Sequence, residues 1–155
     1  MPLLKVGDQA PDFTLVSDNN EPVSLRDFHG RIVVLYFYPK DFTTGCTKEA
    51  CAFRDDFSEF KRRDIAIIGI SYDKPEEHEK FKMGYDLPFV LLSDKNKEVS
   101  KMYGADGLVY AKRITYIIDK DGKILAVYPK VDVNSHSKEI LEFIDSRTSE
   151  RQSKG

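Results

Sequence analysis

The chain has 155 residues, of which 41% are hydrophobic, and its 24 basic and 26 acidic side chains leave a net charge of −2. This length suits one domain with a sizeable core, and the lack of a basic block argues against nucleic-acid binding. No apolar run approaches the ~20 residues of a membrane helix, and two cysteines cannot staple a disulfide-rich scaffold, so both of these classes are excluded.

The first forty residues predict a small hairpin followed by a buried strand. Short alternating runs at 13–16 and 23–25 flank a turn-rich segment at 18–22, which is typical of a hairpin covering one end of a sheet. The continuous apolar run at 32–38 is typical of a strand buried on both faces, and we expect it to be the central strand. Pro39 ends this strand because proline cannot donate a hydrogen bond to a sheet ladder.

A helix is expected to begin near Thr44 and to lead into a second buried strand. Apolar side chains recur at steps of four, three, four and three along one predicted helical face, at Cys46, Ala50, Phe53, Phe57 and Phe60. The apolar run at 65–71 follows this helix. The order strand, helix, strand predicts a right-handed crossover between parallel strands.

The second half of the chain predicts shorter elements. Asp73 as the cap, Pro75 in the first turn and Gly84 at the end indicate another helix. The remaining elements are expected to be a strand at 87–93, a helix at 97–103, a hairpin formed by 114–119 and 124–128, and a last helix at 137–147. This order matches an α/β, thioredoxin-like fold, with a mixed central sheet flanked by helices and an N-terminal β-hairpin extension. The domain is expected to span residues 1–147, followed by a polar, disordered tail at 148–155.

Cys46 draws attention because it stands at the predicted start of a helix. The unpaired backbone N–H groups and the positive end of the helix macrodipole favour anions there, and the thiolate is the nucleophilic form of cysteine. Cys51 follows five residues later and is displaced by about 140° around the helix. The pattern alone leaves open that Cys46 is a small core residue and Cys51 incidental. The spacing is not the C-x-x-C of thioredoxins or zinc ribbons, and no metal site is expected.

The segment from Tyr38 to Cys51 resembles the active-site signature of the peroxiredoxins, in which proline, three residues, threonine, two residues and cysteine follow one another. The matching residues are Pro39, Thr43 and Cys46. The likeness extends over nearly the whole chain, and the continuation resembles the bacterioferritin-comigratory-protein, or peroxiredoxin Q, branch through Thr47, Glu49, Cys51 and Phe53-Arg54-Asp55.

Two residues depart from the pattern of this branch. Thr44 stands where the branch more often carries proline, and Phe42 stands where a small or acidic residue is commoner. These changes could alter the rigidity of the loop and substrate access, but they remove no catalytic group.

The resemblance implies a thiol-dependent peroxidase that reduces hydrogen peroxide and organic hydroperoxides. Cys46 is then the peroxidatic nucleophile, and Thr43 can offer its hydroxyl to the thiolate and to the incoming oxygen. Pro39 would shield the thiolate from water, and the backbone N–H groups of Gly45 and Cys46 can hydrogen-bond the peroxide. Arg113 is permanently charged and can stabilise both the thiolate and the leaving oxygen.

The resemblance also implies how the oxidised enzyme is recycled. Cys51 matches the resolving cysteine, which condenses with the Cys46 sulfenic acid to an intrachain Cys46–Cys51 disulfide, as in an atypical 2-Cys enzyme. A thioredoxin or similar dithiol then reduces this bond, and no cofactor is required. Glu49 resembles an acidic residue that orients the site, although an exposed first-turn glutamate is an alternative. We expect a monomer, because the resolving thiol lies in the same helix.

Other functions are less well supported by the sequence. A thiol-disulfide oxidoreductase would suit the fold but lacks its C-x-x-C pair, and a partner-binding or holdase module would need no reactive thiol. A cysteine hydrolase would need a histidine base, yet His29, His78 and His136 all lie in polar surroundings and are expected at the surface. The amino terminus lacks the pattern of a secretory signal, which indicates a cytoplasmic location.

Disulfide formation within one helix has a geometric consequence. Residues five apart on an ideal helix have Cα atoms about 8.6 Å apart, given a rise of ~7.5 Å and a radius of ~2.3 Å. A disulfide requires roughly 4.4 to 6.8 Å between Cα atoms. We therefore predict that the first turns of the helix unfold locally when Cys46 and Cys51 become joined.

Overall fold

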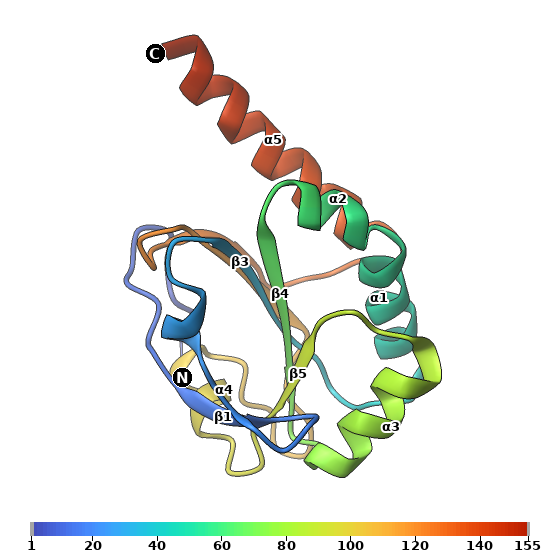
Figure 1. The fold of residues 1–155 in the computed structure, drawn as a ribbon. Helices are drawn as coiled ribbons and strands as arrows, with labels where there is room; N and C mark the ends of the chain where they lie inside the picture. Colours follow the sequence, from blue (N-terminus) through green and yellow to red (C-terminus); the bar gives the residue numbers. More distant parts are fainter. Residues whose placement is uncertain (1, 155) are drawn as a thin grey trace.

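The computed structural model describes residues 2–154, and the side chains of residues 2–147. Its strands and helices are β1 (Thr14–Ser17), β2 (Pro22–Ser24), η1 (Leu25–Phe28), β3 (Ile32–Phe37), α1 (Thr44–Asp55), α2 (Phe57–Arg62), β4 (Ile65–Ser71), α3 (Pro75–Tyr85), β5 (Val90–Ser93), α4 (Glu98–Met102), β6 (Ile114–Ile118), β7 (Ile124–Tyr128) and α5 (His136–Lys154). The strands form one sheet of seven in the order β2-β1-β5-β4-β3-β6-β7. Figure 1 shows β4 between β3 and β5. This mixed sheet with flanking helices is the expected thioredoxin-like architecture.

The predicted strand pairings are confirmed. β3 lies parallel to β4, as the crossover through α1 and α2 predicts, and antiparallel to β6 on its other side. β1 and β2 form the N-terminal hairpin, which extends the sheet because β1 also pairs antiparallel with β5. β6 and β7 form the second hairpin. β3 is thus an interior strand, although β4 occupies the middle of the sheet.

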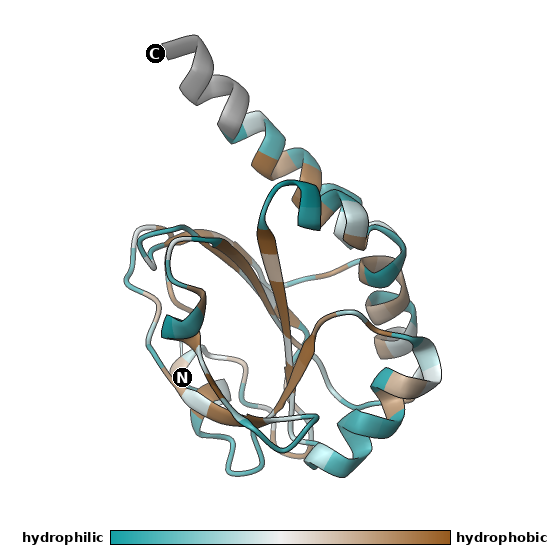
Figure 2. Ribbon diagram, viewed as in Figure 1, coloured by the Kyte–Doolittle hydropathy of each residue, from teal (hydrophilic) through white to brown (hydrophobic). Residues whose placement is uncertain are grey.

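Two apolar clusters pack on opposite faces of the sheet. Alternate residues of β3 point to opposite sides, so Val34 and Tyr36 join one cluster while Val33 and Leu35 join the other. The first cluster contains buried side chains of α1, α2, α3 and α5, and the second lies under η1, α4 and the N-terminal segment. Apolar colour accordingly concentrates on the central strands in Figure 2. Within residues 2–154 no helix is both long and apolar enough to cross a membrane.

The helix predicted to carry the stripe from Cys46 to Phe60 is interrupted. α1 ends at Asp55, and α2 starts at Phe57 after the non-helical residue Asp56. The Asp56 carboxylate accepts a hydrogen bond from Ser137 Oγ of α5 at 2.6 Å, which ties this break to another helix. The stripe nonetheless stays buried at Cys46 and Phe60, with exposed fractions of 1% and 0%.

The ends of two later helices differ from the sequence prediction. Lys74, not Asp73, is the residue before the first turn of α3, because the Asp73 carboxylate bonds elsewhere. Gly84 lies inside α3, which ends at Tyr85, and the following residue Asp86 has a left-handed conformation with φ of 51°. α5 continues to Lys154 rather than ending at 147, since its polar residues contain no proline or glycine before Gly155. The side chains of 148–154 and Gly155 lie outside the described residues.

Candidate active site

Cys46 lies in the first turn of α1, at the end of the loop that leaves β3. Thr43 precedes the helix with extended backbone, and its carbonyl accepts the backbone N–H of Thr47 at 2.9 Å, so the helix starts as predicted. The thiol is free and is 1% exposed. Burial at a helix N-terminus places the sulfur close to backbone N–H groups that have no partner within the helix.

Arg113 reaches Cys46 from β6, the strand next to β3. It directly precedes β6, whose residue Ile114 pairs with Phe37 at the end of β3, so the strand pairing brings residue 113 to the start of α1. Arg113 Nη2 donates to Cys46 Sγ at 3.3 Å. A Cβ atom on Gly45 would lie 3.0 Å from the same Nη2, tighter than most contacts, so glycine leaves room for the guanidinium.

Glu49 completes a compact cluster of three side chains. Arg113 Nη1 donates to Glu49 Oε1 at 2.7 Å, while Glu49 is buried at 1% exposure. This excludes the alternative of an exposed first-turn glutamate. Burial raises the pKa of Glu49 from 4.5 to about 7, and the charge of Arg113 opposes the rise. Among the described residues, Glu49 Oε2 has no hydrogen-bond partner, so the carboxylate is only half satisfied.

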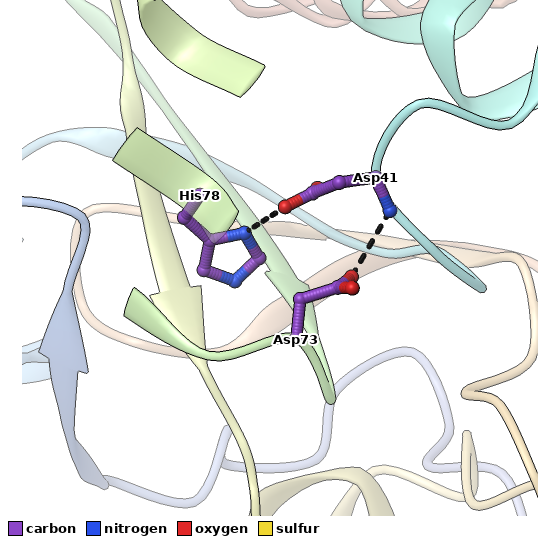
Figure 3. Close-up of side chains that lie close together, drawn as sticks. All are labelled: Asp41, Asp73 and His78. Carbon is purple, nitrogen blue, oxygen red and sulfur yellow. Dashed lines mark hydrogen bonds and ion pairs between the residues drawn. The ribbon is translucent and has the colours of Figure 1, made fainter. Parts of the chain in front are cut away.

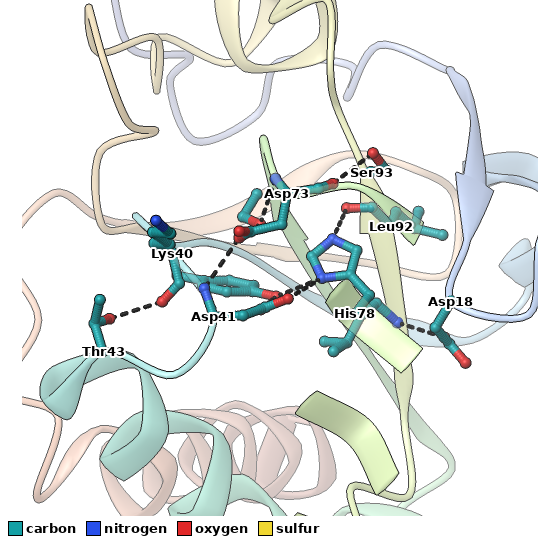
Figure 4. Close-up of polar contacts among 11 residues, drawn as sticks. Asp18, Lys40, Asp41, Thr43, Asp73, His78, Leu92 and Ser93 are labelled. Carbon is teal, nitrogen blue, oxygen red and sulfur yellow. Dashed lines mark hydrogen bonds and ion pairs between the residues drawn. The ribbon is translucent and has the colours of Figure 1, made fainter. Parts of the chain in front are cut away.

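Among the described hydrogen bonds, none joins Thr43 or Pro39 to this cluster. The hydroxyl of Thr43 donates to the carbonyl of Lys40 at 2.7 Å (Figure 4), so here it turns toward its own loop instead of Cys46. Pro39 lines a surface groove together with Lys40, Tyr72 and Tyr110. The structure therefore unites Cys46, Glu49 and Arg113, with Gly45 as their spacer.

Cys51 lies in the same unbroken helix as Cys46, and its thiol is also free. It is half-buried, and burial raises its pKa. Since the two cysteines occupy positions five apart in α1, they have the helical spacing for which about 8.6 Å between Cα atoms is expected.

Phe42, one of the two departures from the branch pattern, has a specific place in the loop. Its backbone lies in the left-handed region at φ 66°, which is uncommon for a bulky residue. Its ring packs against Phe81 and Tyr85 of α3, with centroids 5.1 and 6.2 Å away, although 54% of the residue stays exposed. The aromatic side chain therefore fastens the loop to α3.

The prediction that all three histidines lie at the surface was wrong for His78 and His136. His29 is exposed, but His78 and His136 are 0% and 1% exposed. The burial of His78 was not predicted because its neighbours in the sequence are charged, whereas its hydrogen-bond partners come from other elements. A signal was present, since His78 lies three residues before the buried Phe81 and therefore on the same helical face.

His78 takes part in a buried cluster with Asp41 and Asp73 (Figure 3). Its Nδ1 lies 2.6 Å from Asp41 Oδ2, and its Nε2 lies 3.0 Å from the carbonyl oxygen of Leu92 (Figure 4). Asp73 Oδ2 accepts the backbone N–H of Asp41 at 3.0 Å. Within the described part of the chain these three residues are the one group with donor atoms close enough to suit a metal ion. Those atoms already have hydrogen-bond partners, which fits a structural network better than a metal site.

A buried thiol at a helix start, with a guanidinium directed at its sulfur, on a thioredoxin-like fold defines a thiol-dependent redox protein. Residues 6–127 match the model of the AhpC/TSA family. The chain is 41% identical over 149 residues to the peroxiredoxin Bcp of Bacillus subtilis, covering 91% of this chain and 95% of that protein.

Two solved structures have the same fold. The crystal structure of peroxidoxin BcpB from Mycobacterium tuberculosis superposes with a TM-score of 0.88 at 35% identity, covering 92% of this chain and 97% of that one. A structure of the bacterioferritin comigratory protein from Xanthomonas campestris, described in terms of its alkyl peroxide reduction activity, gives a TM-score of 0.82 at 25% identity, with 87% and 91% covered. The chain belongs to the AhpC/TSA family, as a peroxiredoxin of the bacterioferritin-comigratory, or peroxiredoxin Q, type.

Proposed function

We propose that Cys46 is the peroxidatic cysteine of this peroxiredoxin. The thiolate attacks the terminal oxygen of a hydroperoxide, so that an S–O bond forms, the O–O bond breaks and the leaving oxygen takes up a proton as water or an alcohol. Cys46 is oxidised to sulfenic acid as the peroxide is reduced. The observation that carries this assignment is the 3.3 Å hydrogen bond from Arg113 Nη2 to the buried sulfur.

The neighbouring residues are assigned supporting parts in the same step. Arg113 stabilises the thiolate and the charge that develops on the leaving oxygen, because its partly buried guanidinium acts in a medium of lower dielectric constant than water. Glu49 holds the guanidinium through Nη1, which leaves Nη2 directed at the sulfur. Gly45 and Cys46 supply backbone N–H groups to the peroxide. Thr43 turns its hydroxyl from the carbonyl of Lys40 to the substrate.

Pro39 is assigned the task of keeping water from the thiolate, because its ring offers no N–H group. We include both hydrogen peroxide and organic hydroperoxides as substrates. The likeness to the Xanthomonas campestris protein, which is described for alkyl peroxide reduction, supports the second class.

Resolution is assigned to Cys51. Its thiolate attacks the Cys46 sulfenic sulfur, so that an S–S bond forms and the S–O bond breaks, and the leaving oxygen takes up a proton as water. The two thiols lie in one continuous helix, whose ideal geometry exceeds the roughly 4.4 to 6.8 Å that a disulfide allows between Cα atoms. The first turns of α1 must therefore open, at a cost of about 1 kcal/mol for each hydrogen bond lost.

A thioredoxin or similar dithiol then reduces the disulfide, which makes the chain a thioredoxin-dependent, atypical 2-Cys enzyme. We assign it a monomeric state, because both thiols of the cycle belong to one helix. A cytoplasmic location is part of the same proposal, since two free thiols suit a reducing compartment.

Intact-mass analysis after one equivalent of hydrogen peroxide tests the proposal. The reduced chain should lose two hydrogen atoms as it forms the disulfide, and a dithiol should restore the original mass. Cys46→Ser should stay unmodified under the same conditions, because a hydroxyl is a poor nucleophile near neutral pH. A wild-type mass that does not change, or a Cys46→Ser variant that consumes peroxide as fast as wild type, would contradict the mechanism. A thiol-disulfide oxidoreductase would instead oxidise reduced thioredoxin at the expense of a disulfide substrate, without any peroxide.

A further inference from the structure

The loop that delivers Cys46 to the site is tied to α3 by buried polar groups. Asp41, in the middle of this loop, is 4% exposed, and His78 on α3 is 0% exposed. The imidazole bridges the Asp41 carboxylate at 2.6 Å and the carbonyl oxygen of Leu92 on β5 at 3.0 Å. One side chain therefore connects the loop, α3 and β5 (Figure 4).

The donors and acceptors of this network are fully matched. The Leu92 carbonyl can only accept, so His78 Nε2 donates to it, and His78 Nδ1 faces Asp41 Oδ2 at 2.6 Å. Asp41 Oδ1 accepts the hydroxyl of Tyr38 at 2.6 Å. The backbone N–H of Asp41 donates to Asp73. A buried network of this kind favours one loop conformation, because any displacement leaves a polar group without a partner.

The anchored residue lies five positions before Cys46, and the loop between them is under conformational constraint. Phe42, the next residue, adopts φ of 66°, which a bulky side chain rarely does without support from its surroundings. Fixing Asp41 on one side of Phe42 therefore determines where α1 starts and where its first N–H groups point.

We propose that His78 is a positioning residue for the peroxidase reaction, which holds the Asp41 loop so that Cys46 stays in the first turn of α1 beside Arg113. This inference rests on the proposed function. The anchor favours the helical form, which reduces peroxide, over the opened form, which forms the disulfide. Loss of the anchor should slow the first chemical step while leaving the second unchanged or faster.

His78→Leu tests the proposal, because it removes both hydrogen bonds and fills the same space with an apolar side chain of similar size. We expect the second-order rate of Cys46 oxidation, followed by rapid-quench mass analysis, to fall about tenfold or more. Backbone amide exchange over residues 40–46 should become faster. His78→Gln, whose amide still offers two N–H donors, should restore most of the rate.

Val99→Ala in α4 is the matched control. Val99 is buried in the apolar cluster on the face of the sheet opposite to α3, the helix that carries His78. It should lower the free energy of unfolding while both chemical steps stay within about twofold of wild type. An equal loss of the peroxide step in Val99→Ala would overturn the proposal, because general destabilisation would then explain it. A His78→Leu variant that oxidises Cys46 within about twofold of the wild-type rate would overturn it as well.

Tyr38→Phe provides a milder variant should His78→Leu fail to fold. It removes only the hydroxyl that bonds Asp41. Backbone amide exchange over residues 40–46 should become faster and Cys46 oxidation slower, as in His78→Leu but to a smaller extent. Unchanged exchange and oxidation rates would refute the anchor. The proposed function is tested separately by the wild-type chain. If wild-type Cys46 does not react with peroxide, the proposed function fails, while the exchange data still decide whether His78 anchors the loop.

Discussion

Replacing Glu49 with glutamine isolates the effect of a buried charge. Glu49 is 1% exposed, and one of its oxygens bonds Arg113 at 2.7 Å. Glutamine has nearly the same shape and can still accept from Arg113, but it carries no charge at any pH. The free energy of unfolding of Glu49→Gln should therefore match that of wild type at low pH and differ from it at a pH where Glu49 is ionised.

The magnitude follows from the pKa of Glu49, which burial raises from 4.5 to about 7 in the folded chain. A carboxyl whose pKa is higher in the folded state stabilises the fold below its unfolded pKa of 4.5, and that stability is lost as the pH rises through about 7. Ionisation at pH 8 therefore costs wild type about 3 kcal/mol of folding free energy relative to pH 4.5. Glu49→Gln avoids this cost.

Urea unfolding of both reduced proteins between pH 4.5 and 8 measures the effect. The two midpoints should coincide at the acid end, and the variant should become more stable by about 1.5 M urea at pH 8, for a slope of ~2 kcal/mol per molar. Other titrating groups cancel in the difference between the two proteins. A difference that stays constant with pH would refute the reasoning. The gain in stability of Glu49→Gln at pH 8 should be accompanied by slower peroxide reduction, because the Arg113 guanidinium loses its charged partner.

Three further substitutions test the remaining parts of the site. Arg113→Met should slow Cys46 oxidation by roughly a hundredfold in stopped-flow measurements, with little loss of stability at pH 5, where Glu49 is neutral; an unchanged rate would remove Arg113 from the site. Cys51→Ser should still be oxidised once by peroxide and then accumulate sulfinic acid, whereas a mass spectrum of the fully reduced chain would contradict the resolving role. Gly45→Ala should displace Arg113 Nη2, from which its Cβ would lie 3.0 Å, so that peroxide reduction slows even as the helix gains about 0.5 to 1 kcal/mol; equal activity would show that the guanidinium can yield.

Much of the fold could be predicted because its elements carry local patterns. The runs at 32–38 and 65–71 are almost entirely apolar, as expected for strands covered on both faces, and they contain β3 and β4. The interruption at Asp56 was not predictable from the same kind of pattern, because the apolar stripe continues across it. At the break, the carboxylate of Asp56 accepts a hydrogen bond from Ser137, which lies 81 residues away in the sequence and leaves no local signal.

The candidate site shows the same division between local and distant information. Cys46 and its helix could be located from the sequence, and the resemblance to peroxiredoxins singled out Arg113. The burial of Glu49, and the rise in its pKa that burial causes, could not be predicted, since both depend on residues distant in the sequence that pack around α1 in the folded chain. The Asp41 and His78 pair was missed for a similar reason, because 37 residues separate its members.

The non-helical residue Asp56 also sets a limit on how far the chain can rearrange. Its carboxylate is held by Ser137 of α5, so α2 and Phe60 have an attachment independent of α1. If opening stays confined to the first turns of α1, Phe53 keeps its contact with Phe60, with ring centroids 5.9 Å apart, and the aromatic cluster around them stays covered. We expect the oxidised protein to expose little new apolar surface and to resist aggregation through many catalytic cycles.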